Sequence, residues 1–166
     1  MKYDDASWHY GGFPAGMPTE AGATHIGMFV AWCMLNGLAG EIHTDEFPDD
    51  LEALKARRIT PGEFVINACD EKFTDEDLTD EGNRFALAYF GTPQGMGEYV
   101  TEYEHTLSSG EPTLYHIKDS WENYDKLAPV IDRRFREWKE GKLSSFAEKD
   151  FDLGGIVEEK PWWKFW

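Results

Sequence analysis

The chain has 166 residues, and its 32 acidic against 16 basic side chains give a formal net charge of −16. Aromatic residues make up 15% of the sequence, which excludes an acidic disordered chain, and the length suits one domain. The charge argues against nucleic acid or an anionic membrane as a partner, because phosphates would be repelled, and it favours a basic protein.

The first half of the chain predicts an irregular arm followed by short helices. Aromatic anchors alternate with Gly and Pro through residues 1–19. From Thr19 or Glu20 to about Gly40, apolar residues recur at helical spacing, which predicts a core helix. Further helix starts are expected at residues 47–50, where Pro48 precedes two aspartates, and at 60–63. Thr74 and Asp77 have the spacing of a capping box.

The second half predicts longer helices separated by glycine-rich turns. Residues 85–90 are apolar and aromatic, 91–97 read as a loop, and 98–107 return to helical spacing. Residues 113–117 are the only fair strand candidate. A last helix is expected from Asp119 or Ser120 to about Glu140, kinked or broken at Pro129.

These elements predict a mainly α, single compact domain of about five to seven helices, with at most a minor strand element. Its parts are an irregular arm at 1–19, a helical core at 20–140 and a tail at 141–166.

The acidic residues are concentrated in the middle of the chain. Residues 41–81 hold 14 acidic and four basic side chains, a net charge of −10. The helix dipole explains a single acidic cluster at a helix start, but it does not explain the total charge of the segment. A basic partner would relieve the repulsion among these acidic side chains. The candidate partner-binding residues are Asp45, Glu46, Asp49, Asp50, Asp70, Glu71, Asp75, Glu76 and Asp77.

No motif indicates catalysis, so we expect no catalytic residue, no metal and no cofactor. Residues 75–77 lack the Gly and Glu of a calcium loop, and 91–97 lack the Lys of a phosphate loop. One alternative is a small enzyme or metal-binding protein built on His9, His25 and His43. Carboxylates lie near them in sequence (Asp4, Asp5, Asp45 and Glu46), but no pair has a metal-specific spacing.

The chain lacks the features of a secreted or membrane-spanning protein. Its first residues have no basic start followed by an apolar core, and the apolar run at 21–39 contains His25 and Asn36. Two cysteines, Cys33 and Cys69, are too few for a disulfide scaffold, and we expect both to be buried free thiols. We therefore expect a cytoplasmic protein.

The last six residues, 161–166, are unusually aromatic. Trp162, Trp163 and Trp166 either fold back over the core or contact a partner, because three indoles are costly to leave in water. A second alternative is therefore an adaptor that associates with itself through this tail. Otherwise we expect a monomer or a weak homodimer.

Three segments carry a resemblance to a known group of proteins: KYDDASWHYGG at 2–12, AGATHIGMF at 21–29 continuing to 38, and WWKFW at 162–166. With them the chain resembles a family of small, acidic bacterial proteins that look like the immunity proteins of polymorphic toxin systems, including those delivered by contact-dependent secretion. The resemblance implies a protein that binds one cognate toxin and blocks its active site or substrate access, without performing a reaction. It implies no catalytic residues.

Overall fold

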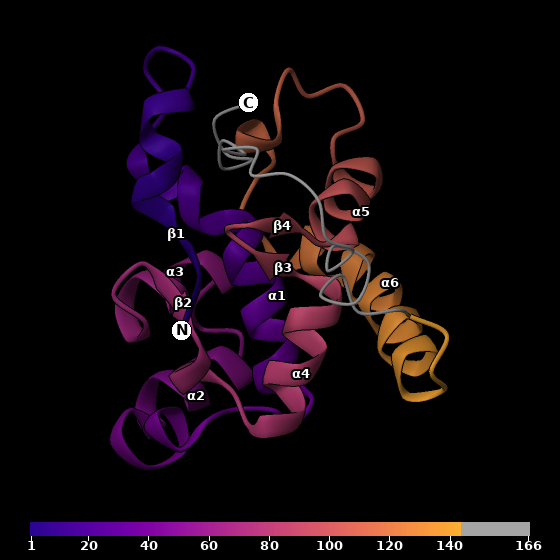
Figure 1. Cartoon of the computed structure of the whole chain (residues 1–166). Helices are drawn as coiled ribbons and strands as arrows, with labels where there is room; N and C mark the ends of the chain where they lie inside the picture. Colours follow the sequence, from indigo (N-terminus) through magenta and orange to yellow (C-terminus); the bar gives the residue numbers. More distant parts are fainter. Residues whose placement is uncertain (144–166) are drawn as a thin grey trace.

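Helix α1 (Thr24–Leu35) is the centre of the fold, because its residues from Thr24 to Met34 are all buried. A helix that is apolar on every side is stable only when other elements surround it. The computed structural model describes residues 1–143, and Figure 1 shows the other elements around α1. A 3₁₀ turn, Thr19–Ala23, leads into the helix. The expected helix at 20–40 therefore exists but is shorter.

Two short helices, α2 (Pro48–Lys55) and α3 (Pro61–Ala68), begin where the sequence predicted helix starts. Both pack beside α1. A reciprocal capping box between Thr60 and Glu63 begins α3. Helix α3 lies very close to α1, since a Cβ on Gly27 would approach the Pro61 carbonyl to 2.5 Å. Only glycine permits this approach at position 27.

The N-terminal arm contains a strand that the sequence did not predict. Strand β1 (Lys2–Asp5) pairs antiparallel with β2 (Lys72–Thr74), and a 3₁₀ helix spans Ala6–Gly12. The sequence gives no local sign of this strand, because its partner lies about seventy residues away. The pairing joins the start of the chain to the acidic middle segment.

The remaining helices cover the other sides of α1. They are α4 (Asp80–Tyr89), α5 (Glu98–Leu107) and α6 (Trp121–Lys139). Between α4 and α5 the expected loop forms a small hairpin of β3 (Gly91–Thr92) and β4 (Gly95–Met96). The strand expected at 113–117 was wrong, because Leu114–His116 form a 3₁₀ turn.

Pro129 does not divide α6, which runs continuously from Trp121 to Lys139. Of the kink or break expected there, the break does not occur. Pro129 lies on the exposed face, where water can reach the carbonyl that loses its helical partner. Within residues 1–143, the mainly α, single-domain fold with a minor strand component is confirmed.

Candidate functional site

Five of the fourteen acidic residues of the middle segment line one surface groove. A π-helical turn (Ile42–Glu46) packs beside a 3₁₀ turn (Asp75–Asp77), and the backbone N–H of Gly40 donates to the carbonyl of Asp77 at 2.9 Å. A Cβ on Gly40 would lie 2.3 Å from the Glu76 carbonyl, so glycine permits this approach. The groove between the turns has a volume of about 630 Å³. The carboxylates that line it are those of Glu41, Glu46, Asp75, Glu76 and Asp80.

A second hollow, of about 330 Å³, shares Ile42 and Glu76 with this groove. Phe47 lines this second hollow, and its side chain is 41% exposed. Among the residues whose burial the structure describes, Met1 and Phe47 are the two exposed large apolar side chains. Asp70 and Lys72 also line this hollow. We call the two hollows together the acidic face.

The structure separates the predicted partner-binding residues into exposed and engaged ones. Asp45, Glu46, Asp49, Asp70 and Glu76 are exposed, and Asp50 is half-buried. Asp75 is half-buried and pairs with the N-terminal ammonium, and Glu71 accepts a hydrogen bond from the Tyr10 hydroxyl at 3.0 Å. Asp77 differs from the expectation most, because it is only 5% exposed and accepts hydrogen bonds from interior groups. The tail residues Trp162, Trp163 and Trp166 lie outside the described residues.

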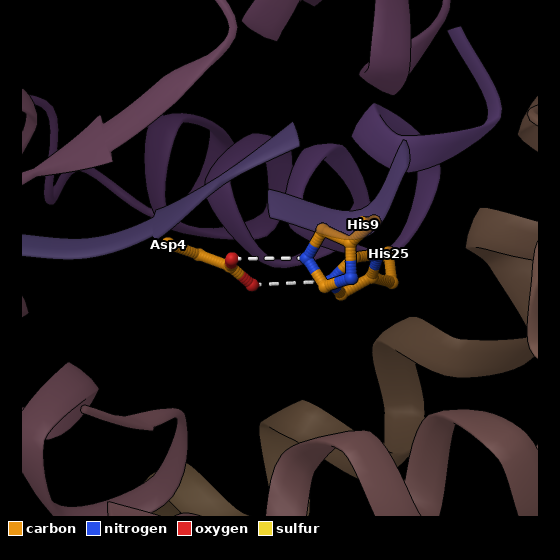
Figure 2. Close-up of side chains that lie close together, drawn as sticks. All are labelled: Asp4, His9 and His25. Carbon is orange, nitrogen blue, oxygen red and sulfur yellow. Dashed lines mark hydrogen bonds and ion pairs between the residues drawn. The ribbon is translucent and has the colours of Figure 1, made fainter. Parts of the chain in front are cut away.

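Two of the three histidines singled out in the sequence meet at one buried carboxylate (Figure 2). Asp4 Oδ1 lies 3.0 Å from His9 Nε2, and Asp4 Oδ2 lies 3.1 Å from His25 Nε2. An ionised carboxylate only accepts, so each Nε2 donates. The backbone N–H of Asp5 donates to Oδ1 at 2.8 Å, and His9 Nδ1 lies 3.0 Å from the Tyr115 hydroxyl.

This Asp4 cluster joins three separate parts of the chain inside the protein. Asp4 is on β1, His25 is on α1, and Tyr115 is in the 3₁₀ turn before α6. Burial alone would raise the pKa of Asp4, but the hydrogen bonds from His25 and His9 outweigh burial and hold that pKa well below its usual range. Burial lowers the pKa of His25, against the opposing effect of Asp4. The three side chains are at most 1% exposed, so the cluster is arranged to hold the fold together.

The third histidine, His43, lies in a different cluster with Asp77 and Cys69. Its Nε2 lies 2.9 Å from Asp77 Oδ1 and 3.9 Å from Cys69 Sγ. A catalytic relay needs the carboxylate on one ring nitrogen and the thiol on the other, whereas here both contact Nε2. Burial, followed by the charge of Asp77, raises the pKa of the Cys69 thiol. The trio is therefore not an activated nucleophile.

Sequence reasoning missed the roles of three residues in these sites. Phe47 was noted only as part of a helix entry. Cys69 was expected to be a buried thiol, whereas the structure makes it half-buried and places it on the wall of the second hollow. Asp77 was expected to face a partner. Each depends on contacts between segments distant in sequence, and only the Thr74–Asp77 spacing gave a local signal.

No helix in the described residues is long and apolar enough to cross a membrane. Comparison with curated proteins gave no match, and neither did comparison with solved structures. One family model, described as a domain of unknown function (DUF7832), matches residues 2–117. That range contains the acidic face, the Asp4 cluster and the His43 cluster, and it ends before α6. The match spans more than half of the sequence, so the chain belongs to the DUF7832 family.

Proposed function

We propose that this protein is a cytoplasmic immunity protein that binds a cognate bacterial toxin through its acidic face. It blocks the toxin's active site or substrate access and performs no reaction of its own. The observation that carries the proposal is the groove lined by five carboxylates beside an exposed phenylalanine. The resemblance of the sequence to immunity proteins of polymorphic toxin systems supports the same class of partner.

The physical case rests on speed and complementarity. An immunity protein must capture its toxin before damage occurs, and complementary charge raises association rates by orders of magnitude at low salt. A toxin that acts on a phosphate-containing substrate has a basic cleft, and the carboxylates of the groove would occupy it in place of phosphates. Phe47 would supply an apolar contact at the centre of such an interface.

The decisive experiment is purification with the toxin encoded by the neighbouring gene, followed by measurement of association kinetics. The test variant neutralises three exposed acids of the acidic face, Asp45→Asn, Glu46→Gln and Glu76→Gln. The matched control neutralises three exposed acids elsewhere, at Glu111, Glu122 and Glu140, so that both variants have the same net charge.

We expect the association rate constant at low salt to fall about tenfold or more in the test variant and much less in the control. Equal effects in the two variants would mean that net charge alone drives association. If no complex forms at micromolar concentration and low salt, the proposal is wrong.

A further inference from the structure

We propose that His43, Cys69 and Asp77 form a binding site for one transition-metal ion of the zinc type. This site is inferred without reference to toxin binding, and its test needs no partner protein.

The three donor atoms already lie close to the arrangement that such an ion requires. One ligand atom from each residue lies within 4.8 Å of the other two. A tetrahedral zinc ion with bonds of about 2.0–2.3 Å holds its ligand atoms roughly 3.3–3.6 Å apart. The Nε2–Oδ1 distance of 2.9 Å and the Nε2–Sγ distance of 3.9 Å each differ from this range by only a few tenths of an ångström.

The chemistry of the donors selects the class of metal. A thiolate, an imidazole and a carboxylate together suit zinc or cobalt, whereas calcium and magnesium prefer oxygen ligands alone. The ion's two positive charges would balance the thiolate of Cys69 and the carboxylate of Asp77. Binding breaks the S–H bond of Cys69 and the N–H bond at His43 Nε2. The thiol proton leaves to solvent, and the neutral imidazole carries its hydrogen on Nδ1 instead, so that Nε2 can ligate the ion.

The surroundings support a bound ion in two ways. Thr74 holds the second oxygen of Asp77 in place. The Thr74 backbone N–H donates to Asp77 Oδ2 at 2.6 Å, and the Thr74 hydroxyl lies 3.2 Å from the same oxygen. The first oxygen, Oδ1, is left directed toward His43. Such outer contacts orient metal ligands in known sites. Cys69 and Asp77 also line the 330 Å³ hollow, which gives an ion a path of entry and leaves room for a water as fourth ligand.

The Asp4 cluster is the weaker candidate, although it also joins a carboxylate to two histidines. Both oxygens of Asp4 already accept hydrogen bonds, and His9 Nδ1 is in contact with Tyr115. Its side chains are at most 1% exposed, whereas Cys69 reaches a surface hollow.

An ion at this site would join three segments of the acidic face. His43 belongs to the π-helical turn, Cys69 directly follows α3 as its C-cap, and Asp77 ends the 3₁₀ turn. Exposed acids lie next to each ligand or two residues away, at Asp45, Asp70 and Glu76. The metal would thus fix the positions of these carboxylates relative to one another.

The test uses the full chain, treated with a chelator and then titrated with Co²⁺, whose thiolate complexes absorb in the near ultraviolet. We expect one Co²⁺ per chain, a thiolate-to-cobalt absorption band and displacement of the cobalt by Zn²⁺. Cys69→Ala should abolish the band and weaken binding more than about 100-fold, because it removes a ligand and not merely an outer contact. The matched control is Cys33→Ala, which removes the other cysteine, buried in α1, and should leave the band unchanged.

A second measurement does not depend on how well a variant folds. In the wild-type protein, Zn²⁺ should protect Cys69 from alkylation, as mapped by mass spectrometry. A wild-type protein without the band or the protection would overturn the proposal. So would a band that persists in Cys69→Ala, or binding that is lost in His25→Gln but kept in His43→Gln, since the ion would then lie at the Asp4 cluster.

Discussion

Asp4 is a buried acid whose charge is balanced by hydrogen bonds from two histidines and one backbone amide. Removing one member of such a group leaves the others buried without partners, which typically costs more than the group's net contribution to stability. At the scale of single residues, Asp4 is therefore the position where a one-atom change should cost most.

We expect Asp4→Asn to lower the free energy of unfolding by about 3 kcal/mol at neutral pH. The matched control is Asp125→Asn, which breaks an exposed pair with Arg57 and should cost less than about 1 kcal/mol. Urea unfolding monitored by tryptophan fluorescence measures both. Equal costs would show that Asp4 is not a key residue of the core.

The same cluster predicts how stability depends on pH. The folded pKa of Asp4 is lowered, so its contribution is complete above the unfolded value of about 4 and is lost as the pH falls below it. The folded pKa of His25 is also lowered, so protonation of the unfolded state reduces stability as the pH falls below about 6.5. His25→Gln should flatten the fall in stability between pH 7 and pH 5, and an unchanged slope would contradict this assignment.

At the scale of elements, the turn after α3 stores conformational strain. Asp70 and Glu71 are consecutive non-glycine residues with positive φ, of 50° and 61°. Each left-handed residue with a side chain costs roughly 1 kcal/mol. The turn places Asp70 on the wall of the second hollow and Glu71 beside Tyr10.

We expect Asp70→Gly to raise the free energy of unfolding by about 0.5–1 kcal/mol, because glycine adopts positive φ without steric cost. The control is Asp49→Gly in the first turn of α2, which should destabilise by a similar amount because glycine weakens helices. Thermal unfolding of both variants tests this, and a destabilised Asp70→Gly would show that its carboxylate stabilises the fold through contacts such as that with Lys72.

The elements also show what the sequence could and could not predict. Pro48 and Pro61 marked the starts of α2 and α3 correctly, because a proline in the first turn is a signal that acts within one turn of helix. The residues of β1 gave no strand signal, because its partner lies far along the chain. The candidate site could be predicted only in part. The density of acidic residues along the chain located the acidic middle segment. The contacts of Asp4 with His25, and of His43 with Cys69, could not be predicted from the sequence, because they form only when distant segments fold together.

At the scale of the whole molecule, the net charge of −16 opposes compactness. At physiological ionic strength, salt largely screens the repulsion between exposed charges that lie more than about 8–10 Å apart. We expect 0.5 M NaCl to raise the melting temperature above its value at 20 mM, and Asp45→Asn, Glu46→Gln and Glu76→Gln together to reduce that salt effect. The triple variant should be more stable at low salt and yet bind its partner more slowly. A melting temperature that falls with salt would mean that attractive ion pairs dominate.

The pairing of β1 with β2 has a consequence for the order in which the protein is made. During synthesis, residues 2–5 are made about seventy residues before their partners at 72–74. Until then Tyr3 and Asp4 have no place in a core, and contacts so distant in sequence form late in folding. The acidic face depends on this pairing, so a nascent chain offers no finished surface. Under the proposed function, a cell would need a mature pool of this protein in place before the toxin is encountered.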